Sequence, residues 1–319
     1  MSAKLRSMSV AIGWGFCVAA IAQQYPTRPI RFITVGGDDA IPRLVAQALS
    51  GQFGKQVFVE EHAGASGTIG AEVASRAPAD GYTFMIATSA HMVTHHFFKV
   101  SYDIQRDFEP VSLLATYPFV LLAHPSLPVK TLDDLIRLAK AKPGQLNYSA
   151  TSAGSTTMLV AEMFKTSAHV NIVHVPYKSV GAALTDVIAG QVQLNVNSIP
   201  STLPQIQAHR VRALAVTTSN RSAVLPEVPT FVEQGLPQIV ATAWSGLLAP
   251  AKTPSSIIAR MNTEVVKALR KPEVRERILA MAMEPAENTP DEFRAFMTAD
   301  LTKWTQAIRD ANISTDARR

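Results

Sequence analysis

The sequence predicts an α/β fold of two lobes, each built on a doubly wound sheet, joined by a two-stranded hinge. From Pro29 onward, short apolar runs alternate with segments of helical periodicity, a pattern typical of parallel strands connected by helices. The chain has 319 residues, which is long for one hydrophobic core and favours two lobes. Residues 119–123 and 244–249 are both apolar runs followed by proline, and we expect them to carry the chain out to a second lobe and back.

Most of the remaining elements are predicted from periodicity and from signals that begin or end helices. A helix is expected after the first strand because Ile41, Val45 and Leu49 recur at helical spacing, with Asp39 as its N-cap. Thr131 and Thr289 each begin a capping-box pattern, so helices are expected after both. Further strands are expected over residues 30–35, 56–60, 83–87, 146–149, 172–175, 192–196 and 213–217, and further helices over about 67–76 and from Ser155, Ser179 and Pro254. The predicted domain limits are 23–117 with 246–319 for the first lobe and 118–245 for the second.

The helix after Thr289 carries an aromatic and apolar stripe at helical spacing. Such a stripe is more often core packing than a cofactor site, and we expect it to return the chain to the first lobe. Its members are Phe293, Phe296, Met297, Leu301, Trp304 and Ile308.

The first 22 residues have the three parts of a cleavable signal peptide. Lys4 and Arg6 form a short positive region, an apolar run follows, and Ala20-Ile21-Ala22 supplies small residues at the expected cut. The apolar run is about 15 residues, which is short of the roughly 20 that span a bilayer. Export to the periplasm is therefore expected, and the cut would also remove Cys17, the single cysteine.

Charge and composition exclude several classes of protein. Removing Lys4 and Arg6 lowers the formal charge from +5 to +3, and the remaining basic residues are scattered without aromatic interleaving. Nucleic acid is therefore not an expected partner. The sequence contains no nucleophile elbow, Walker loop, dinucleotide fingerprint or Cys-x-x-Cys, so neither an enzyme nor a cofactor is expected. His91 and His95 share a helix face, yet no nearby carboxylate completes a metal site.

Three loops that precede helices are rich in Gly, Ser, Thr or Asp: residues 35–39, 88–91 and 149–157. Helix N-termini expose unpaired N–H groups and a partial positive charge, and hydroxyls add neutral donors, so these loops suit a carboxylate. The same residue types also favour ordinary capping and turns. Because the loops follow strands in both halves of the chain, we favour a ligand cleft between the lobes. Residues 175–179 form a fourth candidate segment, in which Tyr177 offers a ring or a phenol and Lys178 a charge.

Motifs spread over residues 24–313 resemble the Bug-type receptors of tripartite tricarboxylate transporters. They include YPTRPIR at 25–31, GASGTIGAE at 64–72, APADGYT at 77–83, HVPYK at 174–178 and LPEVPT at 225–230. The resemblance implies a two-lobed periplasmic-binding-protein fold of type II-like topology that closes on its ligand. By position it also implies the ligand-binding residues, which are Gly36, Gly37, Asp39, Thr88, Ser89, Ala90, Ser152, Gly154, Ser155, Thr156, Tyr177, Asn197 and Ser198.

The sequence departs from the family's pattern at several of these positions. The first loop is shorter than in relatives, since Val35 runs directly into Gly36-Gly37. Met158 stands where many relatives carry histidine, and Asn197 where many carry aspartate. Losing an acidic group beside the cleft would favour a ligand with a second negative charge.

The function that the sequence indicates is a non-catalytic, monomeric receptor for a small organic carboxylate. The ligand could be a mono-, di- or tricarboxylate, an aromatic acid or an acidic amino acid, and the partner would be the membrane subunits of a transporter. Two alternatives stay open at this point: a periplasmic sensor that docks on a signalling protein, and a periplasmic hydrolase that uses Ser or His in the same cleft.

Overall fold

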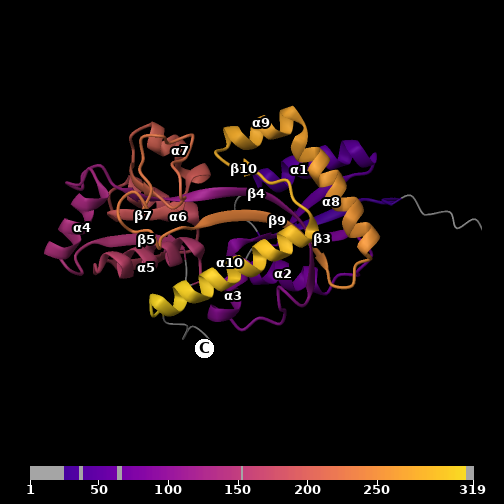
Figure 1. The fold of residues 1–319 in the computed structure, drawn as a ribbon, viewed down its shortest axis with the longest axis horizontal. Coiled ribbons are helices and arrows are strands. Elements are labelled where there is room, and N and C mark those ends of the chain that lie inside the picture. The colour runs from indigo at the N-terminus through magenta and orange to yellow at the C-terminus, as the bar shows by residue number, and fades with distance from the viewer. Residues whose placement is uncertain (1–24, 36–38, 63–66, 152–153, 314–319) are drawn as a thin grey trace, which may run out of the picture.

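The computed structural model describes residues 25–35, 39–62, 67–151 and 154–313. The expected signal peptide and three of the expected ligand-binding residues, Gly36, Gly37 and Ser152, lie outside this part of the chain. Figure 1 shows an elongated molecule in which two groups of strands and helices lie end to end, with long strands between them. The predicted two-lobed α/β fold is confirmed.

The first lobe is built on three parallel strands and one antiparallel strand. Its central strand β1 lies between β2 and β3, which run in the same direction, and β9 pairs antiparallel with β3. The strands are β1 (Ile30–Thr34), β2 (Val57–Glu61), β3 (Thr83–Thr88) and β9 (Thr242–Pro250). Helix α1 (Ala40–Phe53) follows β1, α2 (Thr68–Ser75) follows β2 and α3 (Ser89–Phe97) follows β3.

The second lobe repeats this arrangement. Strand β5 lies between β6 and β7, and all three are parallel. The strands are β5 (Asn147–Thr151), β6 (Val173–Tyr177), β7 (Leu194–Ser198) and β8 (Arg212–Val216), and the helices are α4 (Leu132–Ala141), α5 (Thr156–Ala168), α6 (Val180–Ile188) and α7 (Ile199–Gln207).

One long strand, β4 (Phe108–Ala123), belongs to both lobes. Residues 108–118 pair with β9 in the first lobe. In the second lobe, residues 119–123 pair with β7 on one side and residues 120–123 pair with β8 on the other. The sequence predicts only the last five residues of this strand. Its first part contains Pro110, which has no backbone N–H to donate to a neighbouring strand. The register with β9 also shifts between Pro110 and Ser112.

The two chain segments that cross between the lobes are tied together by Thr217. Phe119 of β4 donates its amide to Thr217 Oγ1 at 3.0 Å, and the hydroxyl donates to the carbonyl of Ala241 at 2.6 Å. Ala241 immediately precedes β9, and its own amide donates to the Thr217 carbonyl at 2.9 Å. Since Thr217 is fully buried, these bonds hold the outgoing and returning segments at a fixed spacing where the lobes meet.

Local signals fix the helix starts as the sequence predicts. Thr131 forms a capping box with Asp134 at the start of α4, and Thr289 forms one with Glu292. Ser155 and Ser179 cap α5 and α6 through the amides of Met158 and Ala182. The C-terminal helices are α8 (Ser255–Arg270), α9 (Pro272–Ala280) and α10 (Pro290–Asp310), and a two-residue strand β10 (Glu284–Pro285) pairs with β4 before α10.

Helix α10 lies along both lobes (Figure 1), where it contacts α3 of the first and α5 of the second. Its stripe packs on β9: the Trp244 ring meets the edge of Phe293 at 5.6 Å between centroids. The buried Asp300 accepts hydrogen bonds from the indole N–H groups of Trp244 and Trp304 at 2.8 and 3.1 Å. Lys303 pairs with the same carboxylate at 2.8 Å, which offsets the cost of burying its charge.

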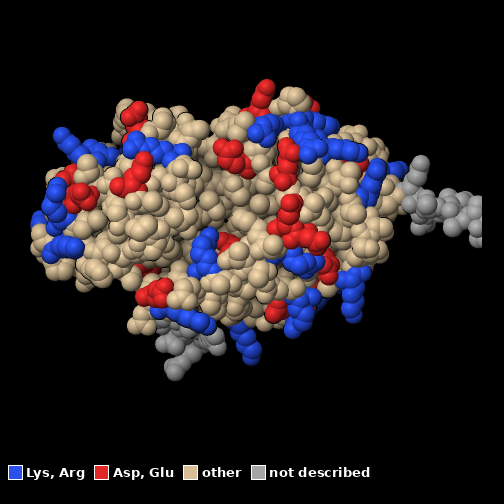
Figure 2. Space-filling view, in the orientation of Figure 1, with Lys and Arg blue, Asp and Glu red and all other residues tan. Residues whose placement is uncertain are grey.

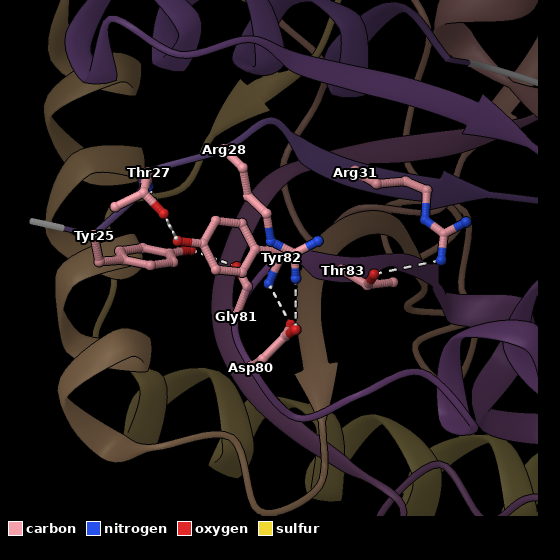
Figure 3. A network of polar contacts seen from close by, with 8 residues as sticks. All are labelled: Tyr25, Thr27, Arg28, Arg31, Asp80, Gly81, Tyr82 and Thr83. Carbon is pink, nitrogen blue, oxygen red and sulfur yellow. Dashed lines mark hydrogen bonds and ion pairs between the residues drawn. The ribbon is translucent and has the colours of Figure 1, made fainter. Parts of the chain in front are cut away.

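The residues that precede β1 are held against the loop that precedes β3, as Figure 3 shows. Tyr25 donates its hydroxyl to the Gly81 carbonyl at 2.5 Å, and the Arg28 guanidinium lies 4.1 Å from the centre of the Tyr82 ring. Arg28 also pairs with Asp80 at 2.7 Å. Gly81 has a φ of +82°, and a Cβ there would lie 2.5 Å from Ile257, so this turn requires glycine. These contacts explain why the YPTRPIR and APADGYT segments occur together.

Gly246 allows α10 to approach β9, and we predict that Gly246→Ala destabilises the protein. A Cβ at this position would collide with the Phe293 ring. We expect a loss of about 1–3 kcal/mol in the free energy of unfolding, measured in urea. Gly51→Ala is the control, because Gly51 lies within α1 with nothing within 4 Å. That change should stabilise by about 0.5–1 kcal/mol, and equal effects of the two substitutions would contradict the packing described here.

Candidate functional site

The C-terminal ends of the parallel strands from the two lobes face each other across β4. β3 runs in the same direction as β4, because both strands pair antiparallel with β9. The last residue of β3, Thr88, lies opposite Ser245 of β9. On its other side, Ser245 lies opposite Ala115 of β4. β7 runs against β4, and its last residue Ser198 lies opposite Phe119. Ala115 and Phe119 are four residues apart, roughly 13 Å along a strand. We call the region between these strand ends, with residues 115–119 as its floor, the interlobe site.

Four helices begin at the interlobe site, α1 and α3 from the first lobe and α5 and α7 from the second. Amides in the first turn of a helix have no partner within the helix and lie at the positive end of its dipole. The topology therefore directs positive helix ends from both lobes at one region. Among the expected ligand-binding residues, those at these helix starts are brought together here, namely Asp39, Thr88, Ser89, Ala90, Gly154, Ser155, Thr156, Asn197 and Ser198.

Thr88 and His91 form the cap of α3. The Thr88 side chain accepts from the backbone of His91, and the Thr88 amide donates to His91 Nδ1 at 3.0 Å. Burial lowers the pKa of His91 to about 4, so the ring is neutral at pH 7. Because Nδ1 accepts a hydrogen bond, the ring proton is on Nε2, which faces Gly67. The threonine–histidine contact thus serves the cap, and a ring with so low a pKa would be a weak general base.

Asp39 places a carboxylate near the start of α1. Its Oδ2 accepts from the Thr34 hydroxyl at 3.2 Å and pairs with Arg43 at 3.6 Å. An ionised carboxylate cannot donate a hydrogen bond, so any contact of Asp39 with an anion would come from its backbone amide.

The start of α5 lies against the first lobe. Gly154 has a φ of +83°, and a Cβ at this position would lie 2.8 Å from Cδ2 of Phe97 on α3. Ser155 accepts from the Met158 amide at 3.3 Å and donates to the Thr151 carbonyl at 3.2 Å. The lobes are therefore in direct contact at Gly154, and the first-turn amides of α5 lie at the interlobe site.

Asn197 offers hydrogen-bond donors without charge at the end of β7. Its side-chain oxygen accepts from the Ser198 amide at 2.8 Å, which fixes the orientation of the side-chain amide. Within the described part of the chain, no group accepts a bond from Asn197 Nδ2. The Ser198 hydroxyl donates to Ser201 at 2.8 Å and is used within α7. Of Asn197 and Ser198, Asn197 is therefore the residue whose side-chain N–H groups can donate to a ligand.

Tyr177 lies at the end of β6, the outermost strand of the second lobe. Its hydroxyl donates to Asp186 of α6 at 2.6 Å, and this bond raises the pKa of Tyr177 to about 12. The phenol is therefore engaged within the second lobe. Lys178 beside it is exposed.

Charge is spread over the molecule rather than gathered at one place. Figure 2 shows Lys and Arg interspersed with Asp and Glu on the face in view. Among the described residues, no group of three or more His, Cys, Asp or Glu side chains is arranged to hold a metal ion. No helix in the described ranges is long and apolar enough to cross a membrane.

The site residues expected from the sequence do not include residues of β4 and β9, the strands at the floor of the interlobe site. Ser245 of β9 lies directly opposite Thr88, and Tyr117 of β4 lies opposite Ala243 of β9. The sequence does mark Ser245, because it is a polar residue between Trp244 and Gly246 in an apolar run. Its place beside Thr88, however, follows only from the pairing of β9 with β3.

The family model described as "Tripartite tricarboxylate transporter family receptor" matches residues 41–313. The chain belongs to this receptor family. BugT from Bordetella pertussis (strain Tohama I) is 33% identical over 305 residues, which cover 93% of this chain and 93% of BugT. The resemblance to Bug-type receptors is confirmed.

Two solved structures share the receptor fold. Rpa4515 of R. palustris, solved with adipate, has a TM-score of 0.85 and 33% identity, over 91% of this chain and 99% of that one. MatC from Rhodopseudomonas palustris, solved with bound malate, has a TM-score of 0.81 and 28% identity, over 89% of this chain and 100% of that one. The family is one of transporter receptors, and the fold class predicted from the sequence is the one that these two neighbours share.

The contact between Gly154 and Phe97 predicts that Gly154→Ala pushes the lobes of this receptor apart. The new methyl would collide with the Phe97 ring, so small-angle X-ray scattering should give a larger radius of gyration than for the wild type. Gly235→Ala is the control, because Gly235 has a similar φ of +79° but nothing within 4 Å. Both variants should lose stability from backbone strain, and equal radii would show that Gly154 does not govern lobe contact.

Proposed function

We propose that this chain is a periplasmic receptor that captures a small organic carboxylate at the interlobe site and delivers it to a tripartite membrane transporter. The observation that carries the proposal is the convergence of helix starts from both lobes on one region. A carboxylate there would accept hydrogen bonds from backbone amides and neutral side chains while lying at the positive ends of helix dipoles.

Adipate and malate, the ligands of the two solved neighbours, are dicarboxylates. A dicarboxylate suits this chain because each lobe directs its own helix starts at the site, so one carboxylate can be held by each lobe. Asn197 supports the same choice, since an amide at this position adds no negative charge. Ligand contacts to both lobes would favour the closed form over the open one, and the closed form would be the one recognised by the transporter.

The ligand-binding residues of the proposal are those expected from the sequence, with Gly36, Gly37 and Ser152 taken from the resemblance alone. The lobe limits of 23–117 with 246–319 and of 118–245 are part of the same proposal. Export is a further part, and it depends on the leader of residues 1–22.

A thermal-shift series with acetate, succinate, malate, adipate, citrate and benzoate tests the proposal. A ligand that binds only the folded protein stabilises it by about 2.7 kcal/mol at a hundred times its Kd, which raises the unfolding temperature by several degrees. We expect the largest shift with a dicarboxylate. No shift with any member of the series, at concentrations up to about 10 mM, would overturn the proposal.

Asn197→Asp should weaken dicarboxylate binding more than monocarboxylate binding. A second charge on the ligand would meet the new carboxylate, at a cost on the order of 1–2 kcal/mol for charges about 8 Å apart near a protein surface. Isothermal titration of succinate and of its monomethyl ester measures this difference.

Asn171→Asp is the matched control, because Asn171 is exposed and precedes β6. It therefore lies at the N-terminal ends of the parallel strands, whereas the interlobe site lies at their C-terminal ends. The substitution makes the same change of charge and should leave both affinities unchanged. An equal loss for both ligands with Asn197→Asp would contradict the proposed placement of Asn197.

A further inference from the structure

Ser245 is a buried serine whose hydroxyl has no hydrogen-bond partner among the residues that the structure describes. The residue is 6% exposed, and its Oγ is fully covered. Other buried hydroxyls in the same sheet are bonded: Ser112 donates to the Leu113 carbonyl at 3.2 Å and Ser149 to the Ala183 carbonyl at 3.1 Å. A hydroxyl that has lost water without gaining a partner destabilises the folded state, so an unpaired one calls for an explanation.

Strand alternation decides which way Ser245 points. Trp244 donates to Asp300 of α10, and a Cβ at Gly246 would meet Phe293 of α10, so both residues face that helix. Successive side chains of a strand point to opposite faces, and Ser245 therefore points away from α10. That is the face of Leu247, which packs in the cluster with the core residues of α1.

Ser245 also lies at the interlobe site rather than in the middle of the sheet. It lies directly opposite Thr88, the last residue of β3, and the first turn of α3 begins at the next residue. The Thr88 hydroxyl is engaged in the α3 cap. Ser245 is thus a hydroxyl at this strand end that is still able to donate.

We infer that the Ser245 hydroxyl donates a hydrogen bond to an anionic oxygen of the bound carboxylate, beside the first turn of α3. The inference rests on the proposed function, because it needs a carboxylate at the interlobe site. A hydroxyl buried next to the positive end of a helix is a strong partner for an anion, since little water competes for it. The same hydroxyl would bind a neutral ligand more weakly, so Ser245 contributes to the choice of an acid over its amide or ester.

Ser245→Ala tests the inference through two effects of opposite sign. Isothermal titration of adipate, malate and citrate should give a Kd raised about tenfold or more for the ligand that binds wild type most tightly. Without ligand, the variant should be as stable as wild type or more stable, because an unpaired polar group has been removed.

Ser112→Ala is the matched control. Ser112 is a fully buried serine of β4 whose hydroxyl already has a partner within the protein. It should bind the same acid with the wild-type Kd and should be less stable than wild type. An unchanged Kd for Ser245→Ala, or an equal rise in Kd for both variants, would overturn the inference while leaving the proposed function intact. Wild-type protein that binds none of these three acids and no other member of the thermal-shift series would overturn both.

Discussion

The pairing of β4 with strands of both lobes is the constraint on which the rest of this structure depends. In the first lobe, β9 lies between β4 and β3, so β3 must run with β4; in the second lobe, β7 pairs directly with β4 and runs against it. The C-terminal ends of both sets of parallel strands are thereby turned toward residues 115–119. Helices that follow those strands begin there, and Thr217 holds the two crossing segments at a fixed spacing.

The donors that we propose for an anion at the interlobe site are mostly neutral groups. Helix N-termini, the Asn197 side-chain amide and the Ser245 hydroxyl can each donate a hydrogen bond without formal charge, and the Asp39 carboxylate is paired with Arg43. Neutral donors hold a carboxylate by geometry more than by long-range attraction, so binding can depend on the positions of both lobes. This is the property that a receptor needs if closure is to report that a ligand is bound.

Elements set by local chemistry could be predicted from the sequence. The periodicity from Ile41 to Leu49 and the capping boxes at Thr131 and Thr289 act within a few residues, and the structure has them as expected. Residues 108–118 of β4 could not be predicted, because Pro110 and Pro118 lie among them and pairing with β9 keeps this part extended. Ser245 was missed for a related reason: its unpaired hydroxyl exists only once β9 lies beside β3.

A crystal structure of the protein with a bound dicarboxylate is the measurement that tests the central claim most directly. We predict one carboxylate at the start of α3 beside Ser245 and the other at the starts of α5 and α7, above residues 115–119 of β4. A ligand that contacts one lobe alone would contradict this account. So would a ligand seated elsewhere, such as in the hollow of about 420 Å³ on the second lobe beside Arg212 and Leu225.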